Sequence, residues 1–143
     1  MLTKDDMLVA LHDAITEDQE FELADEIVDA MEAYPQPFDL VDPVLDFISK
    51  HPEVDFGAPG ELVHFVERFY HQGYEELLME SVLKSPTVYN IWMLHRCFND
   101  NDPNLVRQIQ ILVGELKKDK TLQAIDVRKH LKPISANSLM SSL

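Results

Sequence analysis

The chain has 143 residues, of which 45% are hydrophobic, so it can bury a globular core as one domain. Its 26 acidic residues outnumber its 12 basic ones, and the resulting net charge of −14 repels nucleic acid phosphates and anionic lipid surfaces. A single cysteine excludes an intramolecular disulfide and cannot by itself form a thiolate metal site.

The sequence also favours a cytoplasmic location. A lone cysteine is simplest to explain in a reducing compartment. The first residues, Met1 to Asp6, lack the basic start and apolar core of a secretory signal peptide. The longest apolar runs fall far short of the roughly 20 residues that cross a bilayer. We therefore expect a cytoplasmic protein with no membrane partner.

The negative charge is concentrated at the N-terminal end. The first 55 residues contain sixteen acidic residues against two lysines, whereas the remaining 88 contain ten of each sign. Hydrophobic residues recur at helical spacing through the acidic part, so it is predicted to be a folded surface rather than a tail. Such a surface attracts a basic protein over about one Debye length, about 8–10 Å.

Two capping-box patterns predict the first two helix starts. Thr3 followed by Asp6 places one start near residue 4, and Thr16 followed by Gln19 places the other near residue 17. The second helix is expected to reach about residue 34, where two prolines end it. Its inward face is predicted to be Phe21, Ala24, Ile27, Val28 and Met31. Its opposite face carries an acidic stripe, Asp18, Glu22, Asp25, Asp29 and Glu32.

The third helix is expected from Asp39 or Asp42 to about Lys50, with Pro43 in its first turn. Its inward residues are predicted to be Val41, Val44, Leu45 and Ile48. Its outward face adds a second acidic stripe, Asp39, Asp42 and Asp46.

Prolines and a glycine mark the remaining helices. Pro59, Pro86 and Pro103 each open one, and Gly73 separates the first of these from its successor. Inward positions are expected for Leu62, Val63, Phe65, Val66 and Phe69 on one helix and for Val88, Ile91, Trp92, Leu94 and His95 on another. The predicted helices cover about residues 59–72, 74–84, 86–98, 103–116 and 121–131. The polar tail, residues 133–143, is expected to be poorly ordered.

These eight short helices predict an all-α fold in a single helical domain over residues 1–132. Short connections favour antiparallel helical hairpins stacked side by side, as in a HEAT-like solenoid. The spacing of the helix-opening prolines suggests a repeat of about 30 to 45 residues. Self-similarity between the segments is weak, so a compact bundle is the alternative.

The sequence gives little support for an enzyme. It has no Gly-rich phosphate loop and no His-Glu-x-x-His. Glu61 and His64 have the Glu-x-x-His spacing of helical di-iron sites, with Glu67 and His71 near the same face, but the second such motif is missing. Cys97 is expected to be an inert buried thiol. We expect no catalytic residue, metal or cofactor, and a metal-dependent enzyme stays a minor alternative.

Direct nucleic acid binding is not expected either. A basic cluster lies between residues 117 and 132, but basic side chains are also favoured at helix C-termini. Phosphate contacts would have to overcome the charge of the whole chain. Conversely, carboxylates repeating every helical turn, about 5–6 Å, approximate the spacing of phosphates and could occupy a site built for nucleic acid.

Residues 55–99, about a third of the chain, contain several recognisable segments. These are Phe56-Gly57-Ala58-Pro59-Gly60, Leu62-Val63-His64-Phe65-Val66-Glu67, Gly73-Tyr74-Glu75-Glu76-Leu77-Leu78 and Trp92-Met93-Leu94. The stretch resembles the all-helical immunity proteins of bacterial polymorphic-toxin and contact-dependent growth-inhibition systems. This chain has Glu61 where that pattern usually has a proline. The resemblance implies a small cytoplasmic protein that binds and blocks a cognate toxin, often a nuclease, and it assigns no toxin-contact residue.

Charge and resemblance agree on the partner. Nucleases that act on RNA or DNA need a cationic cleft, which an acidic inhibitor can approach at rates near roughly 10⁸ M⁻¹s⁻¹. Carboxylates four residues apart repel one another by a few tenths of a kcal/mol, so a role beyond monomer stability is expected for them.

Tyr34 and Phe38 are candidate aromatic anchors, or alternatively plug the hairpin end. The predicted partner-binding residues are Asp18, Glu22, Asp25, Asp29, Glu32, Tyr34, Phe38, Asp39, Asp42 and Asp46. The alternative function is a helical-repeat adaptor or chaperone for another cationic protein.

Overall fold

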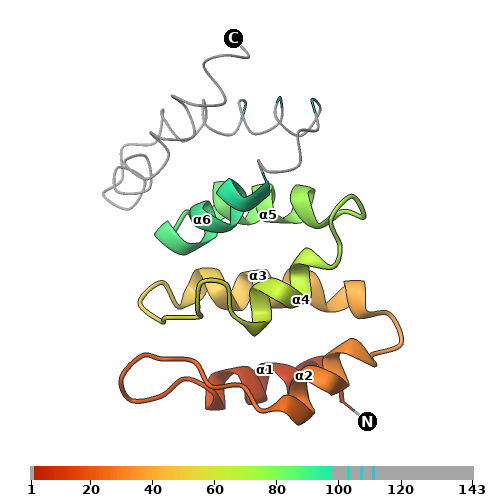
Figure 1. Cartoon of the computed structure of the whole chain (residues 1–143), viewed down its shortest axis with the longest axis vertical. Helices are drawn as coiled ribbons and strands as arrows, with labels where there is room; N and C mark the ends of the chain where they lie inside the picture. Colours follow the sequence, from red (N-terminus) through yellow and green to blue (C-terminus); the bar gives the residue numbers. More distant parts are fainter. Residues whose placement is uncertain (1, 98–102, 104–106, 108–110, 112–143) are drawn as a thin grey trace. The chain divides into compact units, whose positions relative to one another are not determined.

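The computed structural model describes residues 2–97 together with residues 103, 107 and 111. Six α-helices, one 3₁₀-helix and no β-strand occur among these residues, which confirms the all-α prediction for this part of the chain (Figure 1). The six correspond to the first six predicted helices. The predicted helix over 121–131 and the polar tail lie outside the described residues, as does most of the one over 103–116. The chain divides into two compact units, Met1–Tyr74 and Glu75–Leu143.

Helix α1 (Lys4–Asp13) begins where the sequence predicts, because its capping box forms. The Asp6 N–H donates to Thr3 Oγ1 at 3.0 Å, and the Thr3 N–H donates to the Asp6 carboxylate at 3.1 Å. The two bonds satisfy backbone donors at the start of the segment that have no partner within the helix. The bond that the Thr3 N–H donates to the Asp6 carboxylate, and then the Thr3 hydroxyl beside that carboxylate, hold the pKa of Asp6 below its ordinary value of 3.8.

The prediction of a helix from residue 17 is wrong, since α2 spans only Asp25–Glu32. Residues 15–21 instead form a tight turn, in which Ile15 and Phe21 pair as an antiparallel bridge. Thr16 closes this turn from both sides: its N–H donates to the Glu20 carbonyl at 2.9 Å, and its Oγ1 accepts from the Glu20 N–H at 3.0 Å. Gln19 has φ 62°, a left-handed conformation that a helix cannot continue through.

The shorter α2 also changes which residues face the core. Met31 is buried as predicted, but Phe21, Ile27 and Val28 are only half-buried. Ala24, predicted to point inward, is exposed at the N-cap, where the backbone is still extended. Its neighbour, the buried Leu23, takes the inward position instead.

The third helix is close to its prediction. A 3₁₀-helix η1 (Pro37–Leu40) runs directly into α3 (Val41–Lys50), with Pro43 in the first turn, where a missing N–H leaves no helical bond unmade. The predicted inward residues Val41, Val44, Leu45 and Ile48 are all buried.

Helix α4 (Glu61–Glu67) starts two residues after the predicted proline, with Gly60 as its N-cap. The Ala58–Pro59 peptide bond before it is cis. The predicted apolar residues Leu62, Val63, Phe65, Val66 and Phe69 are all buried. The chain then turns over residues 68–73. Gly73 ends the turn at φ 114°, where a Cβ atom would lie 2.9 Å from Phe38 Cζ.

Within the first unit, the helices pack as two hairpins. Helix α1 contacts α2, α3 contacts α4, and α1 also contacts α3, so one hairpin lies against the other (Figure 1). Helix α2 reaches the second hairpin through η1. The core lies between these helices, and its fully buried side chains include Met7, Leu11, Met31, Leu40, Leu45, Ile48 and Leu62.

In the second unit, α5 begins at the boundary (Tyr74–Lys84) and is followed by α6 (Val88–Cys97). Helix α6 starts two residues after the predicted Pro86. A reciprocal pair caps it there: the Asn90 N–H donates to Thr87 Oγ1 at 3.0 Å, and the Thr87 N–H donates to Asn90 Oδ1 at 2.8 Å. Ile91 and Leu94 are buried as predicted. Val88 and His95 are exposed, so their predicted inward positions are wrong, and Trp92 is only half-buried.

Replacing Leu11 by Ala tests the packing of the first unit. Leu11 is fully buried, so Leu11→Ala should lower the free energy of unfolding by roughly 2–5 kcal/mol, measured by urea denaturation. The matched control is Val9→Ala on the same helix. Val9 is 60% exposed, and its loss should change the free energy by less than about 0.5 kcal/mol. Equal effects of the two variants would contradict the packing of α1.

The capping box predicts a pH dependence. A pKa lowered on folding stabilises the native state above the unfolded pKa, and this contribution is lost as the pH falls through the folded pKa. The stability difference between the wild type and Asp6→Asn should therefore be present near neutral pH and shrink below pH 3.8, the ordinary pKa. Denaturation midpoints from about pH 2 to about pH 6 measure it. Asp5→Asn is the control, because Asp5 makes no side-chain hydrogen bond within the described residues.

Candidate protein-binding surface

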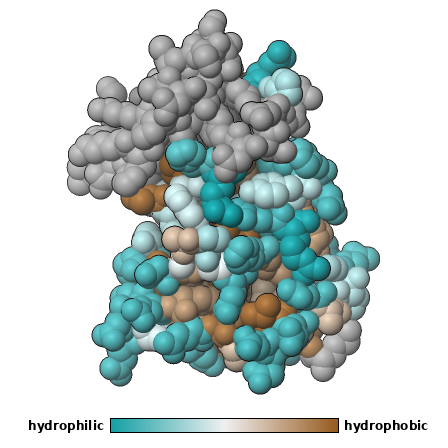
Figure 2. Space-filling view, viewed as in Figure 1, coloured by the Kyte–Doolittle hydropathy of each residue, from teal (hydrophilic) through white to brown (hydrophobic). Residues whose placement is uncertain are grey.

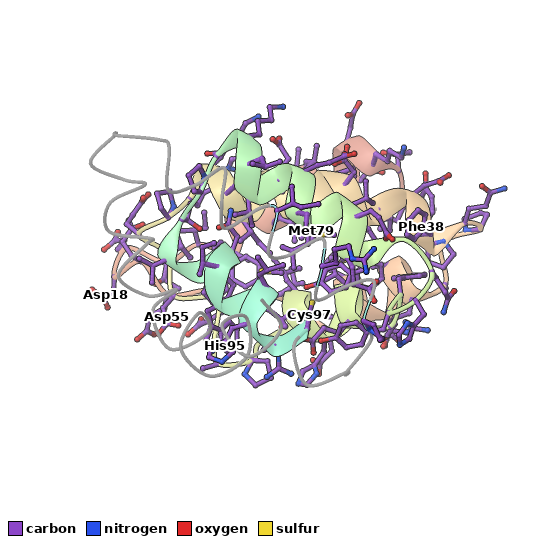
Figure 3. All side chains as sticks on the ribbon, turned by 90° about the horizontal axis from the view of Figure 1, so that it is seen from above. Asp18, Phe38, Asp55, Met79, His95 and Cys97 are labelled. Atoms are coloured by element: carbon purple, nitrogen blue, oxygen red, sulfur yellow. The ribbon has the colours of Figure 1, made fainter. Side chains whose placement is uncertain are left out.

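The predicted acidic residues lie on the surface of the first unit, but not on one continuous stripe. Asp25, Asp29 and Glu32 are exposed on α2, whereas Asp18 and Glu22 lie on the turn and the segment before that helix. Asp39 and Asp42 are also exposed, and Asp46 is half-buried. Figure 3 shows Asp18 and Phe38 at opposite ends of the unit. The ten predicted residues therefore cover a broad area rather than one helix face.

Two ion pairs neutralise part of this surface. Lys50 Nζ lies 2.8 Å from Asp46 Oδ2, and Arg68 Nη1 lies 3.6 Å from Glu32 Oε1. Both pairs are substantially exposed, so each contributes little to stability. No other carboxylate before residue 56 forms an ion pair with a residue that the structure describes. Most of the acidic surface is therefore uncompensated.

The self-repulsion predicted from sequence is smaller than expected. Of the carboxylates four residues apart on the two predicted acidic helices, Asp18 with Glu22 and Glu22 with Glu26 are not within one helix, because α2 begins at Asp25. Two pairs do lie within helices, Asp25 with Asp29 on α2 and Asp42 with Asp46 on α3. The second of these is relieved by Lys50. Among carboxylates four residues apart on the helices of the first unit, only Asp25 and Asp29 lack a described basic partner.

The two predicted aromatic anchors differ. Phe38 packs edge-on against Phe69, with ring centroids 5.5 Å apart, and it lies against Gly73. These contacts match the alternative in which Phe38 plugs the hairpin end. Tyr34 is half-buried at the end of α2, and its hydroxyl makes no hydrogen bond within residues 2–97. Of the two, Tyr34 is the side chain with polar capacity left for a partner.

A pocket that was not predicted from sequence opens in the first unit. It has a volume of about 620 Å³ and lies between residues 20–23 and residues 55–64. Its polar lining residues are Glu20, Glu22, Asp55, Glu61 and His64. Its apolar lining includes Phe21, Leu23 and Phe56. Among the residues predicted to bind a partner, only Glu22 lines it.

Backbone bonds between the two segments form the pocket. The Asp55 N–H donates to the Gln19 carbonyl at 2.8 Å, and Glu20 pairs with Asp55 as a parallel bridge. The sequence gives no local signal for this pairing, because the partners lie more than thirty residues apart. The Asp55 carboxylate is oriented in turn, since its Oδ1 accepts from the Gly57 N–H at 2.9 Å.

The floor of the pocket is part of an aromatic cluster. The ring centroid of Phe21 lies 5.1 Å from that of Phe56 and 6.1 Å from that of Phe47. Phe47 also contacts Phe56 at 5.8 Å. Phe47 and Phe56 are buried, whereas Phe21 stays half-buried at the pocket. The buried rings thus fix the position of a partly accessible one.

The metal-site alternative gains no geometric support from the described residues. Helix α4 ends at Glu67, so His71 follows the helix, in a left-handed conformation at φ 66°. Glu67 accepts a hydrogen bond from the Tyr70 hydroxyl at 2.9 Å. Within residues 2–97, no group of three or more His, Cys, Asp or Glu side chains is arranged to hold a metal ion. Cys97 is buried and donates to the Met93 carbonyl, as expected of a structural thiol.

Two further observations bear on the surface. On the face in Figure 2, most of the described surface is hydrophilic, with hydrophobic side chains in small patches. No helix in the described part of the chain is both long enough and apolar enough to cross a membrane.

No family model, curated protein or solved structure was found to match the chain.

Gly60→Ala tests how rigidly the pocket wall is built. A Cβ atom at Gly60 would lie 1.7 Å from the Phe56 carbonyl oxygen, so the backbone would have to move. We expect the free energy of unfolding to fall by about 2 kcal/mol or more in urea denaturation. Glu61→Ala is the control, because this exposed neighbour should change stability by less than about 0.5 kcal/mol. A fully stable Gly60→Ala would contradict the geometry of this turn.

Proposed function

We propose that this protein binds a basic protein through the exposed carboxylates of its first unit. The observation that carries the proposal is that these carboxylates have few basic partners among the described residues: two ion pairs serve the sixteen acidic residues that precede residue 56. A surface whose function ended with solubility would gain from interleaved Lys and Arg. Asp25 and Asp29 on α2 are the clearest case in the first unit, since they repel each other and neither has a basic partner among the described residues.

We further propose that the partner is a toxin domain, often a nuclease in such systems, and that binding blocks it. The proposal is supported by the resemblance of residues 55–99 to the immunity proteins of polymorphic-toxin systems. It is also supported by charge, because a nuclease needs a cationic cleft to hold its substrate. The acidic residues of α2 lie on an element that contacts η1, and η1 contacts α3, which carries further acidic residues. Carboxylates on neighbouring elements can together occupy a cleft that otherwise binds nucleic acid.

The charge would mainly govern how fast the two proteins meet. Complementary fields raise association rates steeply at low salt, whereas well-packed side chains near the centre of an interface slow dissociation. Tyr34, half-buried at the end of α2, is the proposed aromatic contact. Phe38 is proposed as a support for this end of the hairpin rather than as an anchor, because it packs on Phe69.

A helical-repeat adaptor or chaperone for another cationic protein is the second candidate. The stacking of the α1–α2 hairpin on the α3–α4 hairpin favours it, because repeat proteins stack hairpins in this way. The partner distinguishes the two candidates: a toxin encoded beside the gene supports immunity, whereas a basic protein without toxic activity supports an adaptor.

Charge reversal on α2 tests the proposal. Asp25→Lys/Asp29→Lys should slow association with the toxin domain by about tenfold at low salt and flatten its salt dependence, measured by stopped-flow mixing. The matched control is Glu76→Lys/Glu80→Lys, which makes the same charge change at exposed positions of α5. Circular dichroism checks that both variants stay helical. Equal slowing by the two variants, or none by either, would refute a role for α2.

A further inference from the structure

We infer that the pocket between residues 20–23 and 55–64 receives an arginine side chain of the basic partner. This inference rests on the proposed function and identifies the contact that would hold the partner once charge has brought it close. The pocket lies before α2 and after α3 in the chain, so its carboxylates can be changed without altering Asp25 or Asp29.

The size of the pocket favours an organic cation. Its volume of about 620 Å³ lies within the range of about 300–1,000 Å³ typical of ligand pockets. A bare metal ion would need three or more converging ligands, and the described residues contain no such group. A long cationic side chain needs only a hollow with negative charge at its rim.

The charge of the lining supports a cation. Glu20, Glu22 and Glu61 are exposed and form no side-chain hydrogen bond or ion pair within the described part of the chain. Asp55 is held in place by its bond with the Gly57 N–H. Of the lining residues, only His64 can carry a positive charge.

The aromatic floor favours arginine over lysine. A guanidinium group is planar, stacks on an aromatic ring and donates two parallel hydrogen bonds to a carboxylate. Phe21 is half-buried in the pocket and is fixed by Phe56 at 5.1 Å, so one ring meets an entering side chain between acidic neighbours. A compact ammonium group would be attracted by the carboxylates but could not stack on the ring of Phe21 as a planar guanidinium does.

The pocket is also preorganised. The bond from the Asp55 N–H to the Gln19 carbonyl joins its two walls. Gly57 and Gly60 approach each other so closely that a Cβ atom on Gly57 would lie 2.9 Å from Gly60 Cα. A site already held in its binding shape loses little conformational entropy when it is occupied, which raises affinity.

NMR titration of the full chain with Nα-acetyl-arginine methylamide tests the inference. We expect saturable amide shifts centred on Phe21, Asp55 and Gly57. The lysine analogue should bind at least about threefold more weakly. Absence of saturation, equal affinity for the two probes, or shifts spread evenly over α2 and α3 would overturn the inference.

Matched variants separate pocket binding from general electrostatics. Glu22→Gln/Glu61→Gln should weaken binding of the arginine probe at least about fivefold, whereas Asp25→Asn/Asp29→Asn, with the same charge change, should weaken it less than about twofold. Phe21→Leu should remove the preference for arginine while the protein stays helical. Equal weakening by the two double variants would show that binding of the probe depends only on net charge, and it would overturn the inference.

With the toxin domain as partner, the two proposals can fail separately. Glu22→Gln/Glu61→Gln should speed dissociation by at least about fivefold, whereas charge reversal on α2 should slow association. Faster dissociation together with unchanged association in the α2 variant would refute the role of α2 and keep the pocket. Slower association without any effect of the pocket variant would refute the pocket and keep the proposed function.

Discussion

The backbone bond between Asp55 and Gln19 connects the features on which the first unit depends. It joins the turn after α1 to the loop after α3, and the parallel bridge of Glu20 with Asp55 extends the contact. Because residues 15–21 are held in this turn, α2 can begin only after the turn has ended. The same turn places Phe21 against Phe47 and Phe56. A pairing of two loops thus sets the length of a helix, the position of an aromatic ring and the walls of a pocket.

This arrangement separates the apolar core from the acidic surface. The core of the first unit is formed by apolar side chains of α1, η1, α3 and α4 together with Met31 of α2, and the carboxylates before residue 56 lie outside it. Hydrophobic burial acts at short range and does not depend on the surface charge, so the fold can tolerate an acidic exterior. The acidic surface is consequently free to serve a partner.

The sequence predicted those features that local contacts decide. Thr3 and Asp6 are three residues apart and cap α1 in any context that lets the helix form, so their pattern was sufficient. The inward face of α3 follows from spacing alone, and all four of its predicted residues are buried. Thr16 and Gln19 show the same local pattern, but Thr16 closes a turn, because the pairing of Gln19 with Asp55 competes with the helix. At α6, Pro86 predicted the helix to within two residues, and the reciprocal bonds of Thr87 and Asn90 place its start after that proline.

The candidate site was predictable only in its charge. Composition identified the acidic surface and the residues that carry it, but not the separation of Asp18 from α2 or the ion pair of Glu32 with Arg68. The pocket depends on residues such as Glu20 and Glu61, which share no sequence motif and meet only through the fold. Periodicity describes one element at a time, so it cannot predict a site formed by two segments from different parts of the chain.

Helix α2 shows how the acidic surface and stability are coupled. It has eight residues, far fewer than the roughly 12–15 at which an isolated helix becomes even marginally stable, and its N-cap Ala24 provides no side-chain hydrogen bond. The negative charge of Asp25 interacts favourably with the positive end of the helix dipole, but its repulsion from Asp29 opposes helix formation. The helix is therefore held by the burial of Met31 and by its contacts with α1 and η1. A basic partner would replace the repulsion by attraction, and because it binds the folded state, it would stabilise the helix that recognises it.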